Sequence, residues 1–137
     1  EFESSVIKSS ICSDATLESI RECLHDVVWN DTLGTASVNP WGTRKAQSDL
    51  VAIAGKTGTA QILEKGYSNR RHRMSFVGYF PEENPQYTCI CVIHGPQWPY
   101  DAGMDCGSVV RHIAEKTMAY AGEYVIKNGE LVMVVKE

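Results

Sequence analysis

A lysine, two threonines and two glycines fall within five consecutive positions of this 137-residue chain, Gly55-Lys56-Thr57-Gly58-Thr59. Glycine inside a strand often marks a place where a ligand or another backbone comes close. On a strand with a period of two residues, Thr57 and Thr59 share one side, about 7 Å apart along the chain. Lys56 adds a positive charge beside them. An exposed strand edge of this kind could hold a carboxylate or an oxyanion and pair with an extended peptide.

A phosphate-binding loop is another chemistry that a glycine beside a lysine can indicate. The Walker A loop needs a glycine five residues before its Gly-Lys pair. Leu50 occupies that position here, and an apolar segment, residues 50–54, precedes Lys56 where the loop would need glycines. The spacing therefore argues against a phosphate-binding loop. A glycine-containing turn with a solvated lysine remains as the structural alternative.

Five cysteines, an odd number, cannot all pair within one chain. Cys89 and Cys91 share one face of a period-two segment, where strand neighbours are poorly placed to form a disulfide with each other. A zinc site can be drawn from these two residues with His94 and Cys106, but no Cys-x-x-Cys pair supports it. We therefore expect buried free thiols and no metal site.

The composition excludes several classes of protein. The apolar fraction of 43% and the charged fraction of 22% are ordinary for a globular domain and argue against disorder. The net charge of −4 contrasts with the basic excess of nucleic-acid-binding proteins. No apolar run approaches the ~18 residues of a membrane-spanning helix, and the first residues do not resemble a signal peptide. An acidic start without methionine is expected of a piece of a longer protein.

Two amphipathic helices are predicted to support the motif. Ser13 or Asp14 can cap a helix over 14–28, whose apolar residues recur at helical spacing. The same spacing predicts a second helix over 106–119. The segment 29–46 between the first helix and the motif strand is rich in Gly, Asn, Thr and Pro. It is long for a loop of a compact domain, which indicates a functional role.

Runs of β-branched and aromatic residues bounded by glycine and proline predict the strands. The predicted strands cover residues 2–11, residues 50–54 leading into the motif, residues 74–80 and residues 87–94. A short turn over 81–85 predicts that the last two pair as a hairpin, and Asn128-Gly129 predicts another hairpin in the tail, residues 121–137. This order of elements indicates an α+β fold, an antiparallel sheet with helices packed on it.

The string from Gly55 to Gln61 resembles the Lys-Thr-Gly-Thr strand motif of the penicillin-binding proteins, the serine D,D-transpeptidases of cell-wall synthesis. The surrounding sequence agrees, with Gly34-Thr35-Ala36 before the motif and Ser75-Phe76-Val77-Gly78-Tyr79-Phe80-Pro81 and Glu83-Asn84-Pro85 after it. This succession resembles the class B, division-type enzymes and covers roughly residues 5–119. The resemblance implies the sheet portion of a β-lactamase-like transpeptidase domain over residues 1–120, followed by the tail.

The resemblance also implies roles for the motif residues. Lys56 would supply positive potential near the leaving group and help to move a proton. Thr57 and Thr59 would hydrogen-bond the carboxylate of a peptidoglycan stem peptide or of a β-lactam, and Gly58 would let the acyl donor lie against the strand. The backbone N–H of Thr59 would be one of two oxyanion-hole donors. No metal, organic cofactor or nucleic-acid partner is implied.

In this family the nucleophile is the serine of a Ser-x-x-Lys motif at a helix start, and a Ser-x-Asn motif faces it. Ser5-Val6-Ile7-Lys8 and Ser37-Val38-Asn39 have the right letters. The first lies in a strand-like segment and the second in an irregular loop, and both are too close to Lys56 along the chain. We therefore expect the nucleophile to lie outside this chain and the chain alone to be inactive.

The parent protein implied by this resemblance cross-links stem peptides through an acyl-serine intermediate. It would work on the periplasmic side of the bacterial inner membrane, anchored by a segment outside this chain and associated with other cell-wall synthesis proteins. One alternative is a non-catalytic relative that keeps the peptide-binding strand edge. Another is a fragment of a β-lactamase or of a penicillin-sensing receptor. The strings that follow the motif favour the transpeptidase.

Overall fold

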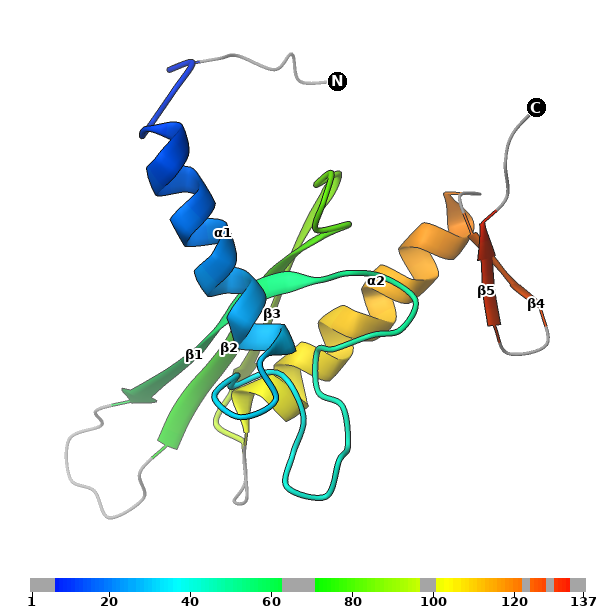
Figure 1. The fold of residues 1–137 in the computed structure, drawn as a ribbon. Helices are drawn as coiled ribbons and strands as arrows, with labels where there is room; N and C mark the ends of the chain where they lie inside the picture. The colour runs from blue at the N-terminus through cyan, green and yellow to red at the C-terminus, as the bar shows by residue number, and fades with distance from the viewer. Residues whose placement is uncertain (1–6, 63–70, 97–100, 122–123, 128–129, 134–137) are drawn as a thin grey trace.

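The computed structural model describes residues 7–62, 71–96, 101–121, 124–127 and 130–133. In chain order the elements are α1 (Asp14–Trp29), β1 (Ala54–Ile62), β2 (Arg71–Phe80), β3 (Tyr87–His94), the π-helical turn η1 (Gly103–Gly107), α2 (Ser108–Tyr120), β4 (Tyr124–Lys127) and β5 (Glu130–Met133) (Figure 1). None of the helices described is long and apolar enough to cross a membrane.

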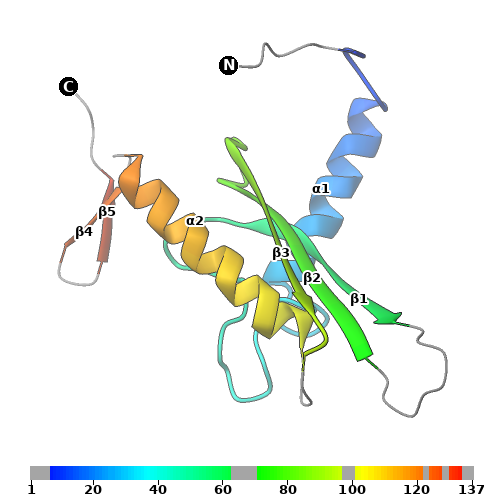
Figure 2. The same cartoon turned by 180° about the vertical axis from the view of Figure 1, so that it is seen from behind.

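An antiparallel sheet with the order β1-β2-β3 forms the centre of the fold. Phe76 in the middle of β2 faces Thr57 of β1 on one side and Cys91 of β3 on the other. The two helices lie on opposite faces of this sheet, as the front and rear views show (Figures 1 and 2). The predicted hairpin of β2 and β3 and the predicted α+β class are both confirmed.

The hydrophobic core lies between the sheet and α2. Alternate residues of β2 point to this face, and residues three or four apart along α2 meet them. The large buried side chains of this layer are Met74, Phe76 and Phe80 from β2, with Val110 and Met118 from α2. This core fixes β2, and β2 in turn holds β1 in register along its whole length.

Helix α1 begins where the sequence predicts. The Ser13 side chain is the N-cap, and its Oγ accepts a hydrogen bond from the Thr16 backbone N–H at 3.2 Å. Of the helix residues only Val28 is buried, while Leu17 and Ile20 in the predicted apolar stripe are 38% and 47% exposed. The helix therefore packs on β1 through its C-terminal half, and its N-terminal half extends beyond the sheet (Figure 1).

The predicted strand over residues 2–11 is wrong where it can be judged. Residues 7–11 form no strand, and Ile7 and Ile11 are 97% and 82% exposed. Residues 1–6 lie outside the described part of the chain. Loose alternation is not sufficient for a strand, because the backbone groups of a strand also need a neighbouring strand to pair with.

The motif strand begins at Ala54 and not at residue 50, which corrects the prediction. The backbone before Ala54 forms other hydrogen bonds. The carbonyl of Ala52 accepts from the Glu82 N–H at 2.9 Å, and the carbonyl of Ile53 accepts from the Trp29 indole N–H at 3.0 Å. These contacts bind the segment to α1 and to the β2–β3 turn. They take the place of the backbone hydrogen bonds that a strand would form with its neighbour.

The second predicted helix begins later than its apolar spacing suggests. A π-helical turn, η1, precedes α2 and contains Cys106, which was expected to start the helix. Asp101 organises this turn, since its Oδ1 accepts from the Met104 N–H at 3.1 Å and its carbonyl accepts from the Asp105 N–H at 2.7 Å. A carboxylate that takes up orphan backbone donors in this way stabilises a helix start.

The tail contains the two predicted strands. β4 and β5 pair antiparallel as a separate two-stranded sheet, with Val125 opposite Val132, beside the C-terminal end of α2 (Figure 1). The Asn128-Gly129 turn that predicted them lies outside the described residues. The division of the chain into residues 1–120 and a tail of residues 121–137 stays a prediction.

Candidate substrate-binding site

β1 carries the four candidate residues at the edge of the sheet. Lys56, Thr57, Gly58 and Thr59 lie in its middle, opposite the segment from Met74 to Val77 of β2. Within the described ranges, β1 pairs with β2 alone. An outer strand edge of this kind presents backbone donors and acceptors to which an extended peptide can add as a further strand.

A short hydrogen-bonded chain joins Lys56, Thr57 and Thr35. Lys56 Nζ donates to the carbonyl oxygen of Thr57 at 2.8 Å and to its Oγ1 at 3.4 Å. That Oγ1 lies 2.7 Å from Oγ1 of Thr35, in the loop before β1. Lys56 is exposed and Thr57 is half-buried. An ammonium and hydroxyl donors therefore lie together at the strand edge, an arrangement suited to a carboxylate.

A cavity of about 300 Å³ opens beside the two motif threonines. Thr57 and Thr59 line it from β1, Lys45 from the preceding loop, and Asp101 from the segment before η1. This volume is at the lower end of those found for small-molecule sites. The threonine side of the motif strand thus faces an open hollow, of mixed polar and apolar lining, that is large enough for a small acidic group.

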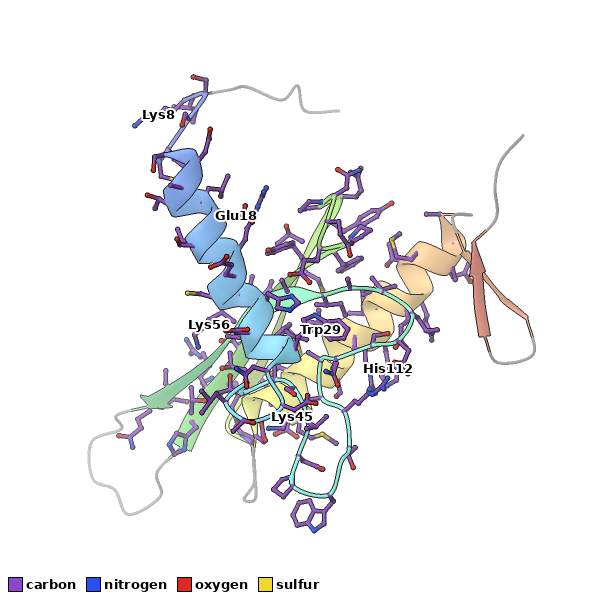
Figure 3. The ribbon with its side chains drawn as sticks, in the orientation of Figure 1. Lys8, Glu18, Trp29, Lys45, Lys56 and His112 are labelled. Atoms are coloured by element: carbon purple, nitrogen blue, oxygen red, sulfur yellow. The ribbon has the colours of Figure 1, made fainter. Side chains whose placement is uncertain are left out.

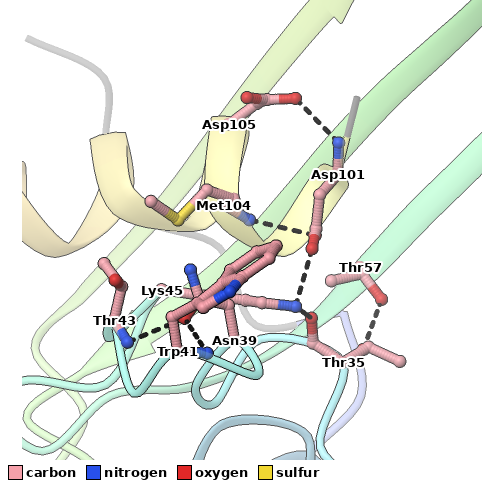
Figure 4. Close-up of polar contacts among 9 residues, drawn as sticks. All are labelled: Thr35, Asn39, Trp41, Thr43, Lys45, Thr57, Asp101, Met104 and Asp105. Atoms are coloured by element: carbon pink, nitrogen blue, oxygen red, sulfur yellow. Dashed lines mark hydrogen bonds and ion pairs between the residues drawn. The ribbon is translucent and has the colours of Figure 1, made fainter. Parts of the chain in front are cut away.

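Lys45 is a buried cation in the wall of this cavity, with 8% of the residue exposed. Its Nζ lies 2.7 Å from Oδ2 of Asp101 and donates to the Thr35 carbonyl oxygen at 3.2 Å (Figure 4). A lysine is seldom buried unless its charge is paired. The sequence prediction did not include Lys45, because a lysine in a polar loop gives no sign of burial and its partner lies far along the chain.

Asp101 is the counter-ion of Lys45. Burial opposes its ionisation, but the hydrogen bond from Lys45, the backbone donors of Met104 and Gly103, and the charge of Lys45 together lower the pKa of Asp101. The ion pair is therefore formed at neutral pH. A carboxyl group with a lowered pKa in the folded state stabilises the fold above its unfolded pKa, and that contribution is lost as the pH falls through the folded value.

The described residues of the two strings that resemble the Ser-x-x-Lys and Ser-x-Asn motifs do not line this cavity. Ser37 is fully buried, and its Oγ donates to Oδ1 of Asp31 at 2.6 Å. The Asn39 side chain accepts from two backbone N–H groups of its own loop, at 2.8 and 3.0 Å. Lys8 lies beyond the N-terminal end of α1, far from Lys56 (Figure 3). Ser37 and Asn39 therefore hold the loop together, while Ser5 lies outside the described residues.

All five cysteines are free thiols. Cys106 is buried, as expected, and Cys89 and Cys91 are half-buried on the side of β3 that faces the core, but the expectation of burial is wrong for Cys23, which is exposed. Burial, with the neighbouring Cys91, raises the pKa of Cys106 to about 12. Burial likewise raises the pKa of Cys89. These two thiols are therefore protonated and weakly nucleophilic at neutral pH.

A larger cavity, of about 610 Å³, lies between α1 and the end of β2. His25 of α1 and Glu82 of the β2–β3 turn are in its wall, with Nδ1 and Oε1 2.8 Å apart. No motif residue lines this cavity. We place the candidate site at the smaller cavity, because that cavity contains the hydroxyls and borders the open strand edge.

The model of the penicillin binding protein transpeptidase domain matches residues 1–119 of the chain. The chain belongs to this family. Among curated relatives, a peptidoglycan D,D-transpeptidase FtsI homolog from Mesostigma viride is 36% identical over 113 residues. Stage V sporulation protein D from Bacillus subtilis is 29% identical over 96 residues. These matches cover 80% and 69% of this chain.

Solved structures of the family have the same fold. The transpeptidase domain of FtsI4 D,D-transpeptidase from Legionella pneumophila matches with a TM-score of 0.58 and 28% identity, over 77% of this chain and 36% of that one. The TP domain of penicillin-binding protein 3 from Burkholderia pseudomallei matches with a TM-score of 0.57 and 27% identity, over 78% of this chain and 30% of that one.

The chain spans 17% of the length of the Mesostigma relative and 13% of the length of the sporulation protein. Even against the isolated Legionella domain it covers little more than a third. The matched region contains the antiparallel sheet and the motif strand. The family and the fold are those that the Lys-Thr-Gly-Thr string and its flanking sequence predicted.

Proposed function

We propose that this chain supplies the substrate-binding strand of a peptidoglycan D,D-transpeptidase that also binds penicillin. The observation that supports this most strongly is the position of Lys56, Thr57 and Thr59 on an open strand edge, where the two threonines line a cavity. An acyl-donor peptide lies along this edge in extended form. Its terminal carboxylate is held by the Thr57 and Thr59 hydroxyls and by the positive potential of Lys56.

The reaction is an acyl transfer in two steps. A serine outside this chain attacks the carbonyl of the terminal D-Ala-D-Ala bond, the C–N bond breaks, and D-alanine leaves with the proton that Lys56 helps to deliver. The amine of a second stem peptide then attacks the acyl-serine, which forms the cross-link and returns the serine hydroxyl. The Thr59 N–H donates to the carbonyl oxygen as its negative charge develops. Gly58 lets the donor lie close to the strand.

The proposed parent protein acts in cell division on the periplasmic side of the bacterial inner membrane. Family membership and the likeness to FtsI homologues support this role. The parent is anchored by a segment outside this chain and associates with other cell-wall synthesis proteins. Its ligands are peptidoglycan stem peptides and β-lactams.

Labelling with a fluorescent penicillin tests this function. We expect the 137-residue chain alone to stay unlabelled, because its described serines lack an activating lysine. The complete protein is expected to label with a stoichiometry near one, and an excess of unlabelled penicillin should abolish the signal. Heat-denatured complete protein is the control for non-specific attachment.

Three results would contradict the proposal in different ways. Labelling of the isolated chain that disappears in Ser5→Ala or Ser37→Ala would place the nucleophile inside the chain. A complete, folded protein that stays unlabelled but still binds stem peptides would instead be a non-catalytic peptide-binding relative. Rapid hydrolysis of the penicillin, without lasting label, would indicate a β-lactamase.

A further inference from the structure

Besides its contact with Lys56, the Thr57 hydroxyl is hydrogen-bonded to the hydroxyl of Thr35 at 2.7 Å. The position of Thr35 depends in turn on Lys45, which donates to its carbonyl oxygen at 3.2 Å. Lys45 is itself fixed by Asp101 at 2.7 Å. These contacts form a continuous path from the segment before η1, through the loop, to the motif strand (Figure 4).

Thr35 is exposed, but the loop that carries it is held by backbone contacts. Its two sides are joined by backbone hydrogen bonds, from Lys45 N–H to the Ser37 carbonyl at 2.8 Å and from Ala46 N–H to the Ala36 carbonyl at 2.9 Å. Gly103 of η1 lies directly against this pair, since a Cβ there would overlap the Thr35 carbonyl oxygen and lie 3.0 Å from Cδ of Lys45. Thr35 therefore sits where three segments meet.

A hydroxyl has one proton to donate and two lone pairs to accept with. Lys56 Nζ donates to Thr57 Oγ1. If Thr35 also donates to that oxygen, the Thr57 proton remains for another acceptor, and the cavity that Thr57 lines is where an acceptor would bind. A substrate carboxylate is such an acceptor. With Thr35 as the donor, this contact leaves the Thr57 proton free for the substrate carboxylate.

We propose that Lys45 is a positioning residue, which through Thr35 orients the Thr57 hydroxyl toward the carboxylate of the acyl donor. The inference rests on the function proposed above. Lys45 does not contact the carboxylate in this role. Its ammonium, neutralised by Asp101, holds the Thr35 backbone in place, and the Thr35 side chain transmits that constraint to Thr57.

The test is a double-mutant cycle on the acylation rate of the complete protein by benzylpenicillin. Lys45→Met removes the charge at similar length, and Thr35→Val removes the hydroxyl at similar shape. Each is expected to lower the second-order acylation constant about tenfold, the usual effect of losing one hydrogen bond. In a Thr57→Val background neither change should lower it further, because the residue through which both act is gone.

A second readout separates positioning from general damage to the fold. The methyl ester of benzylpenicillin lacks the carboxylate, so Lys45→Met should slow its acylation by less than twofold. Arg44→Met is the matched control, because Arg44 pairs with Asp49 at the surface next to Lys45 in sequence. It is expected to acylate at the wild-type rate with both compounds. Lys45→Arg should recover part of the lost rate.

The outcomes distinguish this inference from the proposed function. If the wild-type protein does not acylate, the proposed function is wrong. If it acylates and Thr35→Val has no effect, the positioning role is wrong, whether or not Lys45→Met folds. Equal slowing of penicillin and its ester, or full additivity with Thr57→Val, would also overturn it, because Lys45 would then act on the fold as a whole.

Discussion

Lys56→Ala in the complete protein is expected to lower the rate of acylation by penicillin by about 10²–10³, the usual loss when one preorganised group that stabilises a transition state is removed. Lys56 is exposed on β1, and its Nζ lies within hydrogen-bond distance of the Thr57 carbonyl oxygen. The change removes an exposed positive charge beside the Thr57 hydroxyl and leaves the sheet core untouched. Stopped-flow or quenched labelling with a fluorescent penicillin measures the rate.

Lys8→Ala is the matched control for this experiment. Lys8 is also an exposed lysine, but it lies beyond the far end of α1 (Figure 3). The Lys8→Ala protein should be labelled at the wild-type rate and should melt at the wild-type temperature. A Lys56→Ala protein that folds and labels as fast as Lys8→Ala would show that β1 is not the substrate-binding strand.

Gly55→Ala is expected to cause the largest loss of stability. A Cβ at Gly55 would overlap the Val77 carbonyl oxygen and lie 2.7 Å from the Phe76 ring and 2.9 Å from the Gly78 Cα. Two of these atoms belong to the paired backbone of β2, so relief requires β1 and β2 to separate. Overpacking of this kind costs about 3 kcal/mol. In a domain of this size that lowers the melting temperature by roughly 10 °C.

Gly58→Ala, three residues along the same strand, is the control. A Cβ there would lie 2.5 Å from the Ser75 hydroxyl, the end of a side chain that can rotate away, and 3.9 Å from the Ser75 Cβ, an ordinary contact. We expect its melting temperature to fall by less than half as much as that of Gly55→Ala, measured by circular dichroism. Equal melting temperatures for the two variants would mean that β1 is not packed in the register seen here.

The parts of the fold that the sequence predicted are those with strong local signals. β3 is a run of β-branched, aromatic and cysteine residues between turns, and its limits are those predicted, Tyr87–His94. The capping Ser13 likewise marks the start of α1. The predictions are wrong where contacts between segments far apart in the sequence determine the local structure. The segment before Ala54 reads as strand, but its carbonyls bind α1 and the β2–β3 turn.

In the candidate site, too, the residues that could be predicted from the sequence are those with a local signal. Lys56, Thr57 and Thr59 stand within one short motif, so their common position follows from the period of a strand. Lys45 and Asp101 could not be found in this way, because their pairing depends on how the loop before β1 folds against η1. The sequence motif predicted which strand would touch the substrate, and the residues that pack beside that strand became apparent from the structure.

A crystal structure of the complete protein acylated by penicillin would show directly whether the motif strand β1 holds the substrate carboxylate. We expect the β-lactam carboxylate at about 3 Å from the Thr57 and Thr59 hydroxyls, and the acyl carbonyl oxygen at a similar distance from the Thr59 N–H. The acyl group should be on a serine outside this chain. A β-lactam held in the larger cavity between α1 and Glu82, or held elsewhere with β1 unoccupied, would contradict this expectation.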